Sequence, residues 1–281
     1  MIRLYSLLLY AALPLALLRL LWRSRNTPAY RQRLGERLGL YGGREMAAGL
    51  WIHAVSVGET QAALPLIKHF LESHPRDGVM VTTTTPTGSQ RLRARLEGRV
   101  CHVYTPYDLR PLMNRFLARV GPRLVVVMET EVWPNMLRAC NERKIPVLLA
   151  NARLSARSAR GYARLGGFAR DTFRRLSAIA AQSDADARRF LALGVNSERV
   201  QVTGSIKFDL CLPASLQERA EAMRRAWGCD RPVWVAASTH EGEEEQVLDA
   251  HRRVLRELPE ALLVLVPRHP ERFDRVAALA S

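Results

Sequence analysis

Short runs of apolar residues alternate with longer amphipathic segments along most of this chain. Runs such as WIHAV at Trp51–Val55 and LVVVM at Leu124–Met128 are typical of strands that are buried on both faces. The segments between the runs have the spacing of helices with one apolar face. Strands that alternate with helices indicate a parallel, doubly wound sheet, and therefore an α/β fold with a Rossmann-like domain. We predict strands at 51–55, 78–83, 100–104, 124–128, 147–150, 178–182 and 200–203, and helices at 60–73, 87–96, 109–120, 133–143, 158–176 and 185–193.

A second unit of the same kind follows a polar connector at residues 210–228. A strand at 232–237, a helix that ends near Leu258 and a strand at 261–266 form one βαβ unit. One such unit cannot cover both faces of its own sheet, so we expect the sequence to stop inside a second Rossmann-like domain. The expected divisions are 1–25, 26–210 and 211–281.

The amino terminus carries an uncharged apolar run, Leu4–Leu18, between Arg3 and Arg19. A cleaved signal peptide would place small residues after such a run, but arginines follow directly. Fifteen residues are fewer than the roughly 20 that span a bilayer, although Trp22 suits a membrane interface. We expect residues 1–25 to be a membrane anchor, either spanning or partly inserted. The arginines that follow the run place the body of the protein in the cytoplasm by the positive-inside rule.

The formal net charge of +15 predicts anionic partners. Few aromatic residues are interleaved with the arginines, which argues against nucleic acid and favours an anionic membrane surface. Four arginines, Arg153, Arg157, Arg160 and Arg164, have spacings that place them in one stripe of the helix expected at 158–176 and the residues just before it. A solvated helix face is the other interpretation of that stripe.

The four cysteines are scattered, without CxxC pairing or the spacing of metal ligands. We therefore expect reduced cysteines and no metal site. No Walker motif and no G-x-G-x-x-G follows a strand, which argues against a nucleotide-hydrolysing enzyme or a nicotinamide dehydrogenase and predicts no cofactor.

Three stretches with chemically capable side chains follow predicted strands. They are SVGE at Ser56–Glu59, METEVWPN at Met128–Asn135 and TGSIKFD at Thr203–Asp209. Ligands bind outside the carboxyl ends of strands in open α/β sheets, so we expect these stretches to form one site.

Glu59 has two interpretations. Ser56 and Glu59 match the capping box S-x-x-E, in which the glutamate bonds only to backbone at a helix start. Alternatively, Glu59 is a general base whose pKa is raised in a partly desolvated crevice.

The other stretches offer further charges. Glu129 comes directly off a strand, ahead of Glu131, and Lys207 is one of few lysines in a chain that favours arginine. A lysine ammonium is a compact charge suited to an anionic oxygen. The threonine-rich segment at 81–90 either binds phosphate or sugar hydroxyls or caps the next helix. Arg268 and His269 follow the last predicted strand, where a nucleotide phosphate would bind.

These motifs together resemble the 3-deoxy-D-manno-octulosonic acid (Kdo) transferases of Gram-negative bacteria. The matching segments are HAVSVGE, TTTTPTG, METEVWPN, NARLSARS, GYARL, TGSIKFD, ASTHEGEE and LVPRHPERF, in this order along the chain. The resemblance implies two Rossmann-like domains in the GT-B arrangement. The amino-terminal domain would bind the lipid acceptor, lipid IVA, and the second domain would bind the donor, CMP-Kdo.

The resemblance also implies roles for single residues. Glu59 matches the proton acceptor, and Glu129 and Lys207 match the groups that stabilise the transition state. Arg268 and His269 match residues that contact CMP. The expected reaction is an inverting, metal-independent transfer of Kdo at the cytoplasmic face of the inner membrane. A donor with one phosphate needs less help from a metal than a diphosphate.

Family members are expected to continue beyond Ser281 with segments that complete the donor site, so we expect little activity from this chain alone. Two alternatives stay open. One is another GT-B sugar transferase or a nucleotide-sugar epimerase, which would bind a diphosphate donor. The other is a membrane-tethered, arginine-rich binding module without catalysis.

Overall fold

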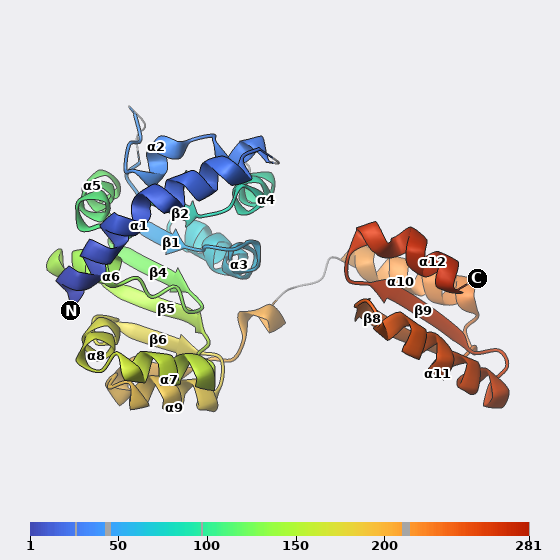
Figure 1. Ribbon diagram of the computed structural model, residues 1–281. Coiled ribbons are helices and arrows are strands. Elements are labelled where there is room, and N and C mark those ends of the chain that lie inside the picture. Colours follow the sequence, from blue (N-terminus) through green and yellow to red (C-terminus); the bar gives the residue numbers. More distant parts are fainter. Residues whose placement is uncertain (26, 43–45, 97, 210–213, 281) are drawn as a thin grey trace. The chain divides into compact units, whose positions relative to one another are not determined.

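The computed structural model describes residues 1–25, 27–42, 46–96, 98–209 and 214–280 (Figure 1). The chain forms two compact units, Met1–Leu210 and Cys211–Ser281. The expected connector at 210–228 lies outside the described residues at 210–213. From residue 214 the structure shows a helix there, α10, Ala214–Trp227.

The first unit is built on a seven-stranded parallel sheet in the order β3-β2-β1-β4-β5-β6-β7. The strands are β1 Leu50–His53, β2 Val79–Thr83, β3 Cys101–Tyr104, β4 Leu124–Met128, β5 Val147–Ala152, β6 Ala178–Ala181 and β7 Val200–Val202. The chain winds outward from β1 to β3 and then returns to β4 beside β1. The direction of winding therefore reverses between β1 and β4, which is where doubly wound sheets bind ligands.

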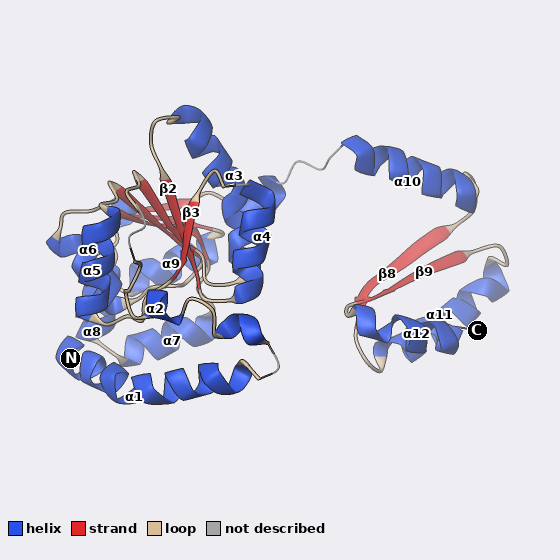
Figure 2. Cartoon of the chain, turned by 90° about the horizontal axis from the view of Figure 1, so that it is seen from above, coloured by secondary structure: helices blue, strands red, loops and turns tan. Residues whose placement is uncertain are grey.

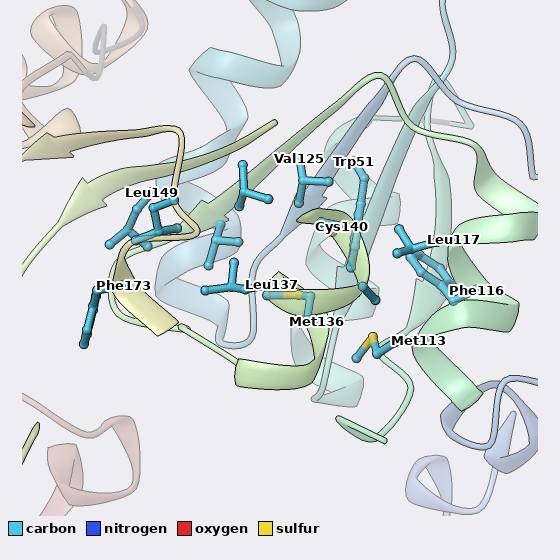
Figure 3. Close-up of a cluster of buried hydrophobic side chains, with 14 of the residues drawn as sticks. Trp51, Met113, Phe116, Leu117, Val125, Met136, Leu137, Cys140, Leu149 and Phe173 are labelled. Carbon is cyan, nitrogen blue, oxygen red and sulfur yellow. The ribbon is translucent and has the colours of Figure 1, made fainter. Parts of the chain in front are cut away.

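Helices cover both faces of this sheet, and this explains its continuous apolar strands. Helices α5 Arg110–Val120, α6 Pro134–Glu142 and α8 Gly167–Phe173 pack on one face. There the Trp51 ring meets Phe116 edge-on, with ring centroids 4.6 Å apart (Figure 3). Helices α3 Val57–Ser73 and α4 Pro86–Leu96 pack on the other face, against Ile52 and its neighbours. Helix α9, Asp184–Ala192, packs beside β6 and β7.

The expected single helix at 158–176 is wrong. Two helices occupy the segment, α7 Ala156–Arg164 and α8, and Gly166 between them has a φ of 53°. That left-handed conformation favours glycine and ends the α7 geometry. Arg153 precedes α7 and belongs to no helix, so only Arg157, Arg160 and Arg164 share one.

The apolar amino terminus is one helix, α1 Ile2–Arg23. By length and composition it could cross a membrane. It lies alongside the first unit, as Figures 1 and 2 show, and the chain then passes through η1 Pro28–Tyr30 and α2 Leu34–Arg37 to β1. The Tyr5 hydroxyl donates to the Asp108 carboxylate over 2.9 Å, and the Tyr5 ring contacts Phe168 of α8. Large apolar side chains of α1 stay exposed at Leu4, Leu7, Leu8, Leu15, Leu18 and Trp22.

The second unit has two parallel strands, β8 Val233–Thr239 and β9 Leu262–Pro267. Helix α11, Glu243–Glu257, connects them, and α12, Phe273–Ala280, follows β9 after η4 Pro270–Arg272. This is the βαβ pattern expected from the sequence.

Candidate active site

The structure brings Glu59, Glu129 and Lys207 to the carboxyl edge of the first sheet. Glu59 follows β1 and Glu129 follows β4, the two strands that flank the point where the winding reverses. Lys207 follows β7 in the short helix η3, Ile206–Asp209, which packs against α3. Three separate segments of the sequence therefore contribute to one edge, as their positions after predicted strands led us to expect.

Glu59 lies in the first turn of α3, not in a loop ahead of it as expected. Ser56 is the N-cap, and its hydroxyl accepts a hydrogen bond of 3.2 Å from the Glu59 amide. The Glu59 carboxylate in turn accepts one of 2.8 Å from the Val55 amide, one residue before the cap. The helix start thus fixes the orientation of this side chain. The capping interpretation is confirmed, and only one of the two carboxylate oxygens is used in it.

Burial raises the pKa of Glu59, and hydrogen bonds from Ser56 and Val55 partly oppose that rise. The negative charges of Glu131 and Glu129 raise it further, Glu131 more than Glu129. A carboxylate that is buried, oriented and repelled by its neighbours binds a proton more readily than an exposed one. A raised pKa and a fixed orientation are conditions that favour a general base.

Glu129 has a φ of 55°, the left-handed conformation that residues with a side chain rarely adopt. Its amide donates to the Ala150 carbonyl of β5 over 2.9 Å, so the turn after β4 is tied to the neighbouring strand. Strained backbone of this kind is concentrated at functional sites. Glu131 accepts a hydrogen bond of 3.0 Å from the Trp133 indole, which fixes its carboxylate near the site. From the sequence alone, Glu129 was the better candidate site residue of the two. In the structure, both carboxylates raise the pKa of Glu59.

Asn151 positions the segment that carries Lys207. It also has a positive φ, 51°, and it is buried at the end of β5. Its side-chain oxygen accepts from the Ile206 amide over 3.3 Å, and its Nδ2 has no partner among the described residues. Lys207, the next residue, is exposed and free to reach an anion. The sequence analysis named Asn151 only as part of the segment NARLSARS. Its position directly after the strand predicted at 147–150 is the signal that could have identified it as a site residue.

A neutral histidine lies beneath the site. His53, at the end of β1, is fully buried, and burial lowers its pKa to about 3. The Trp51 indole donates to the Thr82 hydroxyl over 2.9 Å, and the same hydroxyl is hydrogen-bonded to His53 Nδ1 over 3.0 Å. His53 Nε2 is a buried atom without a partner in the described part of the chain. His53 also meets the Trp133 ring edge-on.

The threonine-rich segment caps a helix and braces the Glu59 turn. The Gly88 amide donates to the Thr85 hydroxyl over 3.2 Å, which confirms the capping interpretation for Thr85. The Thr84 hydroxyl donates to the Val55 carbonyl over 3.0 Å. Val55 is therefore held from both sides, by Thr84 through its carbonyl and by Glu59 through its amide.

Arg268 and His269 belong to the second unit, where both are exposed after β9. The Arg268 amide donates to the Thr239 carbonyl, and the His269 ring lies 6.2 Å from that of His240. The cation that sequence reasoning missed is Arg272, which forms two hydrogen bonds, 2.7 and 3.0 Å long, with the buried Glu244 carboxylate. The acidic start of α11 is thereby partly neutralised within its own unit.

The residues that the structure describes contain no candidate metal site. Nowhere among them do three or more histidine, cysteine, aspartate or glutamate side chains lie close enough together to hold a metal ion. Cys140 and Cys229 are free thiols. Cys211 lies outside the described residues.

Comparison with known proteins identifies the family. Residues 32–210 match the family model of the 3-deoxy-D-manno-octulosonic-acid transferases (kdotransferases). The chain is 44% identical over 277 residues to a 3-deoxy-D-manno-octulosonic acid transferase of Haemophilus influenzae, covering 98% of this chain and 65% of that protein. It is 41% identical over 256 residues to the enzyme of that name from Bordetella pertussis, covering 86% of this chain and 58% of that protein. The chain thus spans about three fifths of the length of these relatives.

Solved structures show the fold. The chain resembles the UDP-GlcNAc 2-epimerase of Neisseria meningitidis with a TM-score of 0.58 at 18% identity, covering 82% of this chain and 68% of that one. This likeness shows the GT-B type of fold, and at that identity it shows the fold alone. The family model and the curated relatives carry the assignment further: the chain belongs to the 3-deoxy-D-manno-octulosonic acid transferase family.

Proposed function

We propose that this chain takes part in the transfer of Kdo from CMP-Kdo to lipid IVA, with Glu59 as the general base. One observation carries the proposal. A buried carboxylate of raised pKa is held by Val55 in the first turn of α3, at the strand pair where the winding of the sheet reverses. The sugar is inferred from the names of the curated relatives, and the reaction mechanism is inferred from the residues at the carboxyl edge of the first sheet.

The step is a single displacement. Glu59 takes the proton of an acceptor hydroxyl while that oxygen attacks the anomeric carbon of Kdo. The bond between this carbon and the CMP phosphate oxygen breaks, and CMP leaves with the electron pair. Attack opposite to the leaving group inverts the configuration. The cation of Lys207 offsets negative charge that develops near the edge, and Glu129 faces the positive charge that develops on the sugar.

The donor is assigned to the second unit and the acceptor to the first. Arg268 and His269 are exposed directly after β9, as groups that contact the CMP phosphate must be. Helix α1 gives the first unit an apolar surface for a membrane, and the expected location is the cytoplasmic side of the inner membrane. The similarity to an epimerase carries no second function, because it reflects the fold alone.

A transfer assay tests the proposal. Labelled CMP-Kdo and lipid IVA are incubated with this chain, and with a chimera that joins residues 1–210 to the second domain of the Haemophilus influenzae relative. Formation of Kdo-modified lipid by the chimera, strongly reduced by Glu59→Gln, is the expected result. A chimera that is folded and binds CMP but forms no product, while the intact relative does, would contradict the role given to the first unit.

A further inference from the structure

A cavity of about 480 Å³ lies between α1 and the loops that follow β2 and β3. Helix α1 forms an apolar wall with Leu15, Ala16 and Leu20. Thr84 and Thr85 from the loop after β2 contribute to the opposite, polar wall. The volume is in the range of sites that hold small molecules. One wall suits a hydrocarbon chain and the other suits a polar group, so the cavity has the character of a site for an amphiphile.

Three arginines line the cavity, and the most buried of them, Arg37, is only 5% exposed and is in no salt bridge with a described carboxylate. The Glu36 carboxylate favours the Arg37 cation through its charge, but its hydrogen-bonded ion pair is with Arg33. Arg37 donates to the Thr84 carbonyl over 2.7 Å, and its guanidinium lies 4.3 Å from the centre of the Tyr104 ring. Its Nε is buried without a hydrogen-bond partner among the described residues. A buried charge of this kind is normally paired, because leaving it unpaired costs several kcal/mol by order of magnitude.

Other groups that line the cavity would also interact favourably with an anion. The buried Tyr107 hydroxyl, which also lines it, has no partner in the part of the chain that the structure describes. Arg19 and Arg23 extend from the last turns of α1 on the apolar side. Arginine is the residue best suited to phosphate, since its planar fork of donors matches two phosphate oxygens.

The cavity is connected to the Glu59 turn through Thr84. Arg37 donates to the Thr84 carbonyl, and Thr84 donates to Val55 through both its amide and its hydroxyl. Val55 then donates to the Glu59 carboxylate. A molecule that fills the cavity therefore lies beside the residues that hold the proposed base.

We propose that this cavity binds the phosphate group of an amphiphile, with Arg19, Arg23 and Arg37 around the phosphate and the hydrocarbon chain along α1. Two sources share this chemistry, a phosphate of the acceptor lipid and the headgroup of a membrane lipid. The first source rests on the function proposed above, and the second does not.

Binding of hexyl phosphate to the chain in micelles of a non-ionic, phosphate-free detergent tests the proposal by calorimetry. We expect one saturable site, with inorganic phosphate at least about tenfold weaker and hexanol without binding. Arg37→Met should weaken hexyl phosphate at least about tenfold, and Arg19→Gln and Arg23→Gln several-fold each. Arg3→Gln is the matched control, because Arg3 is an exposed arginine on the same helix that does not line the cavity.

Displacement of hexyl phosphate distinguishes the two sources. Displacement by lipid IVA but not by phosphatidic acid in the same micelles assigns the site to the acceptor, and the reverse assigns it to a membrane lipid. Equal affinity in all four variants, or no displacement by either lipid, overturns the proposal. Arg19 and Arg23 are exposed, so their variants keep the test decisive even where Arg37→Met fails to fold. Binding is measured apart from transfer, so an active enzyme with an empty cavity would overturn this inference and leave the proposed function standing.

Discussion

The backbone amide of Val55 donates a hydrogen bond of 2.8 Å to the carboxylate of Glu59, four residues later. The same turn contains the cap in which Ser56 accepts from the Glu59 amide. Capping and catalysis are often treated as competing roles for a glutamate at this position. Here the cap holds the carboxylate in one orientation, which is the condition that a general base requires.

Glu59→Gln should reduce transfer by at least about 10²-fold in the chimera, the usual scale for a lost general base. Glutamine retains the shape and can still accept from Val55, so thermal unfolding should change little. Product formation and unfolding temperature are measured on the same preparation. Ser183→Ala is a control for loss of a cap alone, because Ser183 caps α9 in the same way. It should cost about 1 kcal/mol of stability and leave transfer unchanged. Near-native turnover by Glu59→Gln would reduce Glu59 to a structural cap.

Asp108 should make the folded protein lose stability as the pH rises. Burial raises its pKa to about 6, against bonds from Asn135, Tyr5 and Met136 that oppose the rise. A group whose pKa is raised by folding contributes stability below its unfolded pKa of about 3.9 and loses that contribution as the pH passes about 6. The difference in unfolding free energy between the parent and Asp108→Asn should fall by about 2 kcal/mol from pH 4 to pH 7. A difference independent of pH would show that Asp108 keeps an ordinary pKa.

Reversal of charge on α7 should weaken attachment to anionic membranes. Arg157 and Arg160 are exposed on α7, which directly precedes α8, the helix that contacts α1 through Phe168. Each cation near an anionic surface contributes about 1 kcal/mol, so Arg157→Glu with Arg160→Glu should lower partitioning into phosphatidylglycerol vesicles at least about tenfold at low salt. Partitioning into phosphatidylcholine vesicles should change little.

The matched control for α7 is Arg252→Glu with Arg256→Glu, an exposed pair of arginines on α11. Sedimentation measures binding of the parent, the α7 variant and the α11 variant to both types of vesicle. If the α7 and α11 variants lose the same affinity, only net charge matters and α7 has no particular position at the membrane.

Arg272 and Arg268 should have different effects in the second unit. Arg272→Met leaves the buried Glu244 carboxylate without its partner, so hydrogen exchange in β8 and β9 should become faster. Arg268→Met removes an exposed side chain and should leave exchange unchanged. Mass spectrometry of peptides from residues 233–267 measures both. Equal protection in the two variants would show that the Arg272–Glu244 pair does not stabilise the unit.

Strand positions and the candidate site could be read from the sequence because they depend on local pattern. A buried parallel strand is a short apolar run, and the residue after it is at the ligand edge. All seven strands of the first unit were predicted to within a few residues, and Glu59, Glu129 and Lys207 share the predicted edge.

Features that depend on a single backbone angle or on distant contacts could not be read in this way. Gly166 divides the predicted helix at 158–176 because its φ is positive. A single glycine within a helical pattern does not predict a positive φ. Asn151 acts through Ile206, 55 residues later, and Tyr5 reaches Asp108 across 103 residues. Periodicity reports which face of an element is apolar, and it says nothing of which distant polar groups will meet.

The register between β1 and β4 has a consequence for how far sequences of this family can diverge. His53 is opposite Val127 in this strand pair, and the bonds that hold the pair come from the main chain. Any residues that keep two buried strands side by side preserve the separation of the strand ends that carry Glu59 and Glu129. Evolution can therefore replace most of the interior, and exchange the outer loops, without moving the two acids apart.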